Sequence, residues 1–327
     1  MRARLMKSAA RSPNGSGTKR GSRALKVIKK AITKAVAMVA SLLAAMAWLL
    51  AFAEPISITD DSGKVVTLLK PAERIVTLAP SLTELAFAAG AGGKLVAVSA
   101  YSDFPAVAKA LPQIADASGV SLEGLLAIKP DLVIAWKSGN READIKRVVE
   151  LGIPVLVLEV ARLADVSQAI RAIGKLADTA GVADKAASRI DGAFDDLRRI
   201  NRGKARISVF FEVSRLPLMT INRHHAIDEV ISLCGGKNVF RDQVPLVFTP
   251  SLEELFRLQP QAILFPANEA TPPWPQYRGL KAWDEQRIYQ VGADALMRTG
   301  PRLVQGAQQV CAELDQARHS LAVNSDK

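Results

Sequence analysis

One pattern of apolar and polar positions occurs twice along the chain. Residues 121–136 and 251–266 share Ser, Leu, Glu, Leu and Pro at equal offsets, and a run of mostly apolar residues follows each proline. Each copy is typical of a short helix that a serine caps and a proline ends, followed at once by a buried parallel strand. Two such units, one in each half of the chain, predict two lobes of related construction.

The first half alternates short aliphatic runs with helical patterns. Ile56–Thr59 and Val65–Leu69 flank an Asp-Asp-Ser-Gly turn and predict a hairpin. Buried strands are predicted over 74–79, 94–99, 132–135 and 155–158, with helices between them. Strands that alternate with helices in this way form a doubly wound sheet.

The turn after the first buried strand carries a second local signal. Ser81 and Glu84 have the spacing of a capping box, in which each side chain satisfies a backbone N–H at the start of a helix. We therefore expect an ordered turn here, with backbone N–H groups directed at whatever binds beyond the strand.

Helical periodicity dominates from Asp165 to Arg202, with an interruption predicted at Gly181. Charged residues fall between apolar ones that recur at three- and four-residue spacing, which predicts an amphipathic helix packed along both lobes as their connector. The apolar positions are Ile190, Phe194, Leu197 and Ile200.

The second half again alternates strands and helices. Strands are predicted over 206–213 and 287–291, a helix over 226–234 that Gly235 and Gly236 end, and a terminal helix from Met297 and Arg298 onward. The predicted organisation is a leader over 1–53, a lobe over 54–165, a connecting helical segment over 166–203 and a second lobe over 204–327.

The formal charge of +11 comes from the leader. Its 53 residues carry eleven Lys and Arg and no Asp or Glu, and the remainder carries 32 residues of each sign, which removes the support for nucleic-acid binding. The leader ends in an apolar run with Ala51 and Ala53, the pattern of an export signal cleaved near Ala53/Glu54. The alternative is a retained membrane anchor. An exported chain implies the periplasm.

Aromatic residues make up 5% of the chain, so their positions are informative. Tyr101 and Phe104 follow the strand over 94–99, and Trp136 ends the strand over 132–135. The carboxyl ends of parallel strands line ligand crevices, which makes these side chains candidates for a pocket wall. The alternative is ordinary packing.

Catalytic motifs are missing from the sequence. It contains no Gly-x-Ser-x-Gly elbow, phosphate-binding Walker loop or Gly-x-Gly-x-x-Gly fingerprint. His224 and His225 are adjacent, and too few further ligands accompany them for a zinc site. Cys234 and Cys311, the two cysteines, favour a disulfide in an exported chain, with two buried thiols as the alternative. We expect a binding protein without catalytic residues, metal or cofactor.

The region from Arg74 to Ala317 resembles the periplasmic cobalamin-binding proteins that serve an ABC transporter, within the siderophore, haem and cobalamin class of substrate-binding proteins. This resemblance implies an α/β fold of two doubly wound lobes joined by one long rigid α-helix, as in class III periplasmic binding proteins. The stretches that carry it are Thr83–Gly90, Tyr101–Pro105, Leu122-Glu123, Lys129–Trp136 with Gly139-Asn140, Cys234–Phe240, Pro301-Arg302 and Gln308–Cys311.

The resemblance also implies roles for single residues. Tyr101 and Trp136 match pocket aromatics, Asp294 and Arg298 match polar groups across the pocket, and Cys234 and Cys311 match a family disulfide. Glu123 and Glu253 match the two surface glutamates, one on each lobe, that dock onto arginines of the permease, an arrangement that complementary charge would orient. The implied partners are a cobalamin-like metal chelate and the permease, and the protein itself is expected to be a monomer.

The chain also departs from the family pattern. Ala117, Leu246 and Ala295 stand where the resemblance would place further pocket tryptophans, and Phe248 and Trp274 are the candidates to compensate. Each missing ring removes rigid contact surface, which predicts weaker cobalamin binding or another ligand. Cobalamin or another corrinoid is the leading hypothesis, and a ferric siderophore or haem is the second. A periplasmic hydrolase that uses Asp294 is the third.

Overall fold

The computed structural model describes residues 29–42, 54–266 and 275–325. Residues 29–42 form a helix, and the rest of the predicted leader, with Ala53 of its cleavage site, lies outside the described residues. Within the described ranges, no helix has both the length and the apolar character needed to cross a bilayer. Residues 55–327 form a separate compact unit.

The predicted hairpin is present as β1 (Ile56–Thr59) and β2 (Val65–Leu68), paired antiparallel. The carboxylate of Asp60 accepts the backbone N–H groups of Ser62 and Lys64 and so closes the turn. Asp60 also accepts the N–H of Val157 at 3.2 Å, which attaches the hairpin to the neighbouring sheet.

The N-terminal lobe contains a six-stranded sheet in the order β6-β5-β4-β3-β7-β8. All of its strand pairs are parallel except β5–β6, a two-residue antiparallel addition. The strands are β3 (Ile75–Thr77), β4 (Leu95–Ser99), β5 (Gln113–Asp116), β6 (Gly119–Val120), β7 (Leu132–Trp136) and β8 (Val155–Leu158). The helices are α2 (Pro80–Ala88), η1 (Gly92–Lys94), η2 (Ala106–Ala110), α3 (Leu122–Ile128) and α4 (Glu142–Glu150).

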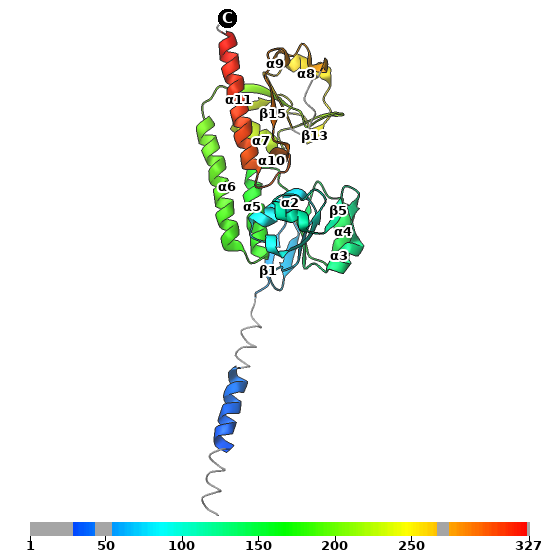
Figure 1. Cartoon of the computed structure of the whole chain (residues 1–327), viewed down its shortest axis with the longest axis vertical. Coiled ribbons are helices and arrows are strands. Elements are labelled where there is room, and N and C mark those ends of the chain that lie inside the picture. The colour runs from blue at the N-terminus through cyan, green and yellow to red at the C-terminus, as the bar shows by residue number, and fades with distance from the viewer. Residues whose placement is uncertain (1–28, 43–53, 267–274, 326–327) are drawn as a thin grey trace, which may run out of the picture. The chain divides into compact units, whose positions relative to one another are not determined.

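The connector consists of two helices, α5 (Leu163–Leu176) and α6 (Ala180–Asn201), which pack against each other (Figure 1). The break lies at 177–179, where Asp178 adopts a left-handed φ of 54°, and Gly181 lies inside α6, so the predicted interruption at Gly181 was wrong. At about 1.5 Å per residue, the 22 residues of α6 span roughly 33 Å. Helix α6 is the longer of the two connector helices and corresponds to the long helix of the predicted fold class.

The predicted apolar face of the connector is largely confirmed. Ile190, Phe194 and Leu197 are buried, but Ile200 is 56% exposed and does not belong to the face. The turn between α5 and α6 is attached to the N-terminal lobe, because the Thr179 hydroxyl donates to the Ala89 carbonyl at 2.7 Å.

The C-terminal lobe contains a four-stranded parallel sheet in the order β12-β9-β14-β15 and a small antiparallel sheet, β10-β11-β13. The strands are β9 (Ile207–Phe211), β10 (Ser214–Arg215), β11 (Leu218–Ile221), β12 (Gly236–Asn238), β13 (Val247–Phe248), β14 (Ala262–Pro266) and β15 (Ile288–Val291). The helices are α7 (Ala226–Leu233), α8 (Leu252–Leu258), η3 (Pro275–Tyr277), α9 (Lys281–Asp284), α10 (Ala293–Met297) and α11 (Leu303–Ser325).

The terminal helix begins later than predicted. Met297 ends the short helix α10, Arg298 has extended backbone angles, and α11 begins at Leu303 after Pro301. Proline disfavours helical angles in the residue before it, which explains the gap between the two helices. This gap leaves Arg298 and Arg302 outside regular helix.

One apolar core runs through both lobes. Ile75 of the first sheet, Ile173 of α5, Phe194 of α6 and Leu314 of α11 are buried members of the same cluster. Two smaller clusters lie on the other faces of the sheets, one with Val133 and α3, the other with Phe210 and Tyr277. Moving one lobe against the other would disrupt close packing along the connector, which favours a fixed arrangement.

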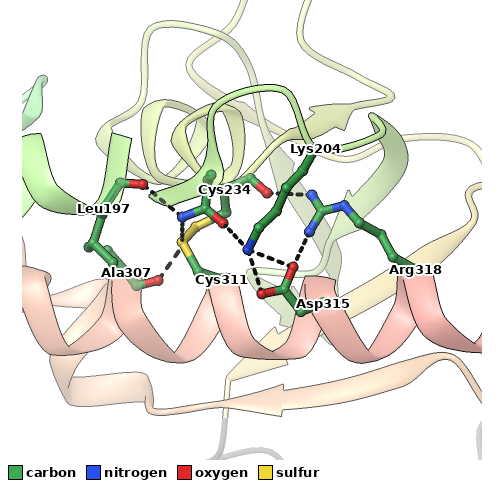
Figure 2. Close-up of a disulfide and its surroundings, with 8 residues drawn as sticks. Leu197, Lys204, Cys234, Ala307, Cys311, Asp315 and Arg318 are labelled. Carbon is green, nitrogen blue, oxygen red and sulfur yellow. Dashed lines mark hydrogen bonds and ion pairs between the residues drawn. A yellow bond between two sulfur atoms is a disulfide. The ribbon is translucent and has the colours of Figure 1, made fainter. Parts of the chain in front are cut away.

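A disulfide between Cys234 and Cys311 joins the end of α7 to α11, as predicted, with Cα atoms 4.7 Å apart (Figure 2). The amide of Asn201, at the end of α6, donates to the Sγ of Cys311 at 3.3 Å. Beside it the ammonium of Lys204 pairs with Asp315 at 2.7 Å. The disulfide therefore lies where the connector meets the terminal helix.

Candidate functional site

The predicted pocket aromatics lie at one edge of the first sheet. Strands β4 and β7 run parallel, and Tyr101 and Trp136 stand at or just beyond their carboxyl ends. Tyr101 is 77% exposed and has a φ of 62°, while Trp136 is 37% exposed. Two large aromatic side chains that remain exposed at the same end of the sheet are each suited to contact an apolar ligand face.

Buried hydroxyl groups hold the turn that carries Tyr101. Thr77 and Thr83 lie 2.7 Å apart, Thr83 and Ser102 2.9 Å, and Ser102 and Ser99 3.1 Å. All four residues are buried. This chain of hydrogen bonds ties the turn after β4 to β3 and α2, and so fixes the backbone on either side of Tyr101.

Trp136 is held by polar contacts at both ends. Its indole N–H donates to Glu159 at 3.2 Å, and its backbone N–H donates to the Asn140 side chain at 2.7 Å. Asn140 in turn donates to the Leu78 carbonyl at the end of β3. The ring is thereby oriented without being buried.

A cavity of about 420 Å³ lies against the carboxyl end of β5. Asp116, Ser118 and Arg141 contribute polar groups to its lining, and Ala100, which precedes Tyr101, is also part of it. Ala117, one of the positions where a tryptophan was expected, is exposed between two of these lining residues.

The capping box predicted at Ser81 and Glu84 is wrong. Helix α2 begins at Pro80, and among the described residues no side chain forms its N-terminal cap. The Glu84 side chain is buried, and its carboxylate accepts two hydrogen bonds from Arg302, at 2.6 and 2.9 Å. Burial raises the pKa of Glu84, and these two hydrogen bonds oppose that rise. The contact joins the two lobes.

A second arginine completes this contact. The Arg298 guanidinium lies 2.6 Å from Asp103 and 3.7 Å from Glu84, both on the N-terminal lobe, and 3.2 Å from Asp294 on its own lobe. The hydrogen bond from Arg298 lowers the pKa of Asp103. We call these five residues (Glu84, Asp103, Asp294, Arg298 and Arg302) the inter-lobe cluster.

The structure brings some predicted ligand residues together and separates others. Asp294 and Arg298 are in contact. Phe104 lies at the same cluster, because the guanidinium of its member Arg302 is 4.4 Å from the Phe104 ring centroid. Phe248 instead packs edge-on against Phe240 in the core of the C-terminal lobe, with ring centroids 5.8 Å apart. Trp274 lies outside the described residues.

Sequence reasoning missed three members of the inter-lobe cluster. The spacing of Glu84 predicts a local cap, and Asp103 and Arg302 lie in the family stretches without a predicted role of their own. A buried acidic position in an otherwise apolar helix was the available signal, because an ionised side chain there requires a partner.

The predicted docking glutamates and the histidine pair lie at or next to the starts of helices. Glu123 and Glu253 are exposed in the first turns of α3 and α8. His225 caps α7 by accepting the N–H of Ile227 at 3.2 Å, and burial lowers its pKa to about 4. Within the part of the chain that the structure describes, no three His, Cys, Asp or Glu side chains gather as a metal site would require.

The chain matches known proteins over most of its length. Residues 75–294 match the family model of the periplasmic binding proteins. A vitamin B12-binding protein of Vibrio cholerae is 35% identical over 248 residues, 75% of this chain and 90% of that protein. Another, from Pectobacterium carotovorum, is 34% identical over 247 residues, 74% of this chain and 88% of that protein.

Solved structures agree with the sequence matches. The periplasmic vitamin B12 binding protein BtuF of Vibrio cholerae has a TM-score of 0.71 and 35% identity, covering 76% of this chain and 98% of that one. The haem-binding protein RhuT from Roseiflexus has a TM-score of 0.65 at 23% identity over 75% of this chain and 99% of that one, and so shares the fold. The resemblance and the class III fold predicted from the sequence are confirmed. The chain belongs to the periplasmic binding protein family.

Proposed function

We propose that this protein binds a corrinoid, with cobalamin as the leading candidate, between its two lobes and delivers it to the permease of an ABC transporter. One observation carries the proposal: relatives at 34 to 35% identity, matched over 88 to 90% of their length, are vitamin B12-binding proteins. The exposed rings of Tyr101 and Trp136 support it, because rigid aromatic surfaces suit a broad ring system.

Isothermal titration of the purified protein with cyanocobalamin tests the ligand. We expect binding at micromolar concentrations or tighter, and at least a tenfold loss for Trp136→Ala, which is about 1.4 kcal/mol. Leu216→Ala is the matched control, because Leu216 is an apolar side chain that is 90% exposed on the other lobe. Absence of binding at micromolar cyanocobalamin would remove cobalamin as the ligand.

A ferric siderophore or haem is the second candidate. The observation that favours it is the lack of tryptophan at Ala117, Leu246 and Ala295, which reduces the aromatic surface available to a corrin ring. Competition titrations with haem and ferric chelates would separate the two candidates, and expression induced by iron limitation would favour the second.

Docking to the permease is assigned to Glu123 and Glu253. Both side chains are exposed at the N-terminal turn of a serine-capped helix, one on each lobe, where they can meet cationic side chains of a partner. Charge reversal at both positions should abolish uptake by cells and leave the ligand affinity unchanged. Glu150→Lys, the same change at an exposed site at the end of α4, is the control. A fall in ligand affinity would contradict the division of roles.

The proposal includes export and the absence of catalysis. We expect the mature protein in the periplasm to begin near Glu54, which N-terminal sequencing would establish, and to be a monomer. Hydrolysis of esters or phosphoesters that is lost on changing Asp294 would contradict a pure binding role.

Because the core continues from lobe to lobe, scattering profiles with and without ligand should nearly superimpose.

A further inference from the structure

The inter-lobe cluster contains more carboxylates than guanidiniums. Three carboxylates, those of Glu84, Asp103 and Asp294, surround the two guanidiniums of Arg298 and Arg302. Glu84 and Arg302 face each other across two hydrogen bonds. Arg298 is then shared between Asp103 and Asp294, so these two carboxylates have one guanidinium between them, and Lys109 is a further cation that acts on Asp103.

The two kinds of side chain differ in their exposure. The side chains of Asp103 and Asp294 are 42% and 55% exposed, whereas those of Arg298 and Arg302 are 19% and 15% exposed. Asp103 and Asp294 are therefore the charged side chains of the cluster that are most exposed to a ligand. Carboxylates accept hydrogen bonds and cannot donate them, so they match N–H or O–H donors on a ligand.

We propose that Asp103 and Asp294 set the charge specificity of the binding site: they favour a neutral ring with carboxamide groups at its edge and disfavour a ring with carboxylates there. The inference rests on the function proposed above and narrows its ligand class. A carboxamide donates its N–H groups to Asp103 and Asp294 and leaves both ion pairs intact.

A carboxylate at the same place meets repulsion without compensation. It would have to displace Asp103 or Asp294 from Arg298 to gain a cationic partner, and the displaced carboxylate would then be left unpaired. Like charges within a few ångströms repel strongly where the surroundings are partly buried, and salt weakens the effect where they are exposed. Each aspartate is expected to contribute roughly tenfold to discrimination, the size of about one pKa unit of interaction.

The test uses two rings that differ only in one kind of chemical group, which occurs at seven positions. Dicyanocobyrinic acid heptaamide and dicyanocobyrinic acid share the corrin ring, and the first has carboxamides where the second has carboxylates. Titrations of both into the purified protein should show at least a tenfold preference for the heptaamide, which shrinks as the salt concentration rises from about 0.05 to 0.5 M. Haem, which carries two carboxylates, serves as a third probe.

The variants are Asp294→Asn, Asp103→Asn and the double substitution, with Asp195→Asn on α6 as the matched control. The double variant should bind cobyrinic acid and haem at least tenfold more tightly than the wild type, and its preference for the heptaamide over cobyrinic acid should fall at least tenfold. Asp294→Asn should give part of this gain and retain the contact between the lobes, so it covers the case in which Asp103→Asn fails to fold.

The outcomes separate this inference from the proposed function. Wild-type protein that binds the heptaamide, with unchanged affinity for both carboxylate rings in the variants, would overturn the inference and keep the function. Wild-type protein that binds neither corrin would overturn the function. In that case a tenfold gain in haem affinity in the double variant would support the charge specificity, and an unchanged haem affinity would overturn it as well.

Discussion

In both lobes a serine side chain accepts the backbone N–H three residues later, Ser121 from Gly124 at 3.1 Å and Ser251 from Glu254 at 3.0 Å. Each seven-residue helix then ends at a residue with a left-handed backbone, Lys129 with φ 51° and Gln259 with φ 43°. A parallel strand follows each proline. The two copies of the sequence pattern therefore have the same local structure.

The copies differ at the ends of their strands. Strand β7 ends in Trp136, which is 37% exposed at the sheet edge, whereas β14 ends in Phe265 and Pro266, both buried. Phe265 belongs to the same apolar cluster as Tyr277 and Phe210. One unit thus ends in an exposed aromatic ring and the other in core residues, so the two copies differ in the last residues of the strand.

The largest expected effect tests this difference in stability. Phe265→Ala should lower the free energy of unfolding by about 3 to 5 kcal/mol, because it leaves a cavity in a packed cluster. Trp136→Ala should cost less, since its ring is partly exposed. Urea denaturation of the two variants checks the comparison, and similar losses for both would contradict it.

Low pH should lower the stability of the fold through a residue of the C-terminal lobe, His225. All three histidines lie in the C-terminal half, and the folded protein lowers the pKa of His225 to about 4 from an ordinary 6.5. Between these values the unfolded chain binds a proton that the folded protein does not, so stability is complete above pH 6.5 and falls toward pH 4. The loss should reach up to about 3 kcal/mol.

His225→Asn is the control for this prediction, because asparagine caps helices well and does not titrate. Denaturation at pH 7 and at pH 4.5 should show a smaller acid loss in this variant than in the wild type. Equal losses would mean that the imidazole remains accessible to protons in the folded state.

Sequence reasoning succeeded where a signal was local. Strand and helix positions, the hairpin and the serine caps depend on residues a few positions apart, and the sheet-edge aromatics follow from where strands end. Glu84 shows the limit: its local spacing indicated a cap, but its partner Arg302 is 218 residues away. Which charges meet between the lobes depends on how α5 and α6 place one lobe against the other, and helical periodicity does not specify that.

A smaller effect is expected where the two copies agree. Ser121→Ala and Ser251→Ala should each lower the free energy of unfolding by about 1 kcal/mol, since each leaves one backbone N–H at a helix start without its side-chain acceptor. Thermal or urea unfolding of both single variants checks this. A loss for one serine without a matching loss for the other would show that the caps are not equivalent.

The smallest effect concerns the left-handed residues that end the two helices. The left-handed conformation costs a residue other than glycine roughly 1 kcal/mol. Glycine removes this strain but has greater freedom in the unfolded chain, which offsets most of the gain. Lys129→Gly should therefore raise the free energy of unfolding by only a few tenths of a kcal/mol. Gln259→Gly should instead lower it by about 1 kcal/mol. The Gln259 side chain donates to the Gly279 carbonyl at 3.2 Å and accepts the Lys281 N–H at 3.0 Å, and glycine would lose both bonds. Urea denaturation of the two variants should therefore give changes of opposite sign, and a gain for both would mean that Gln259 contributes nothing to the loop it contacts.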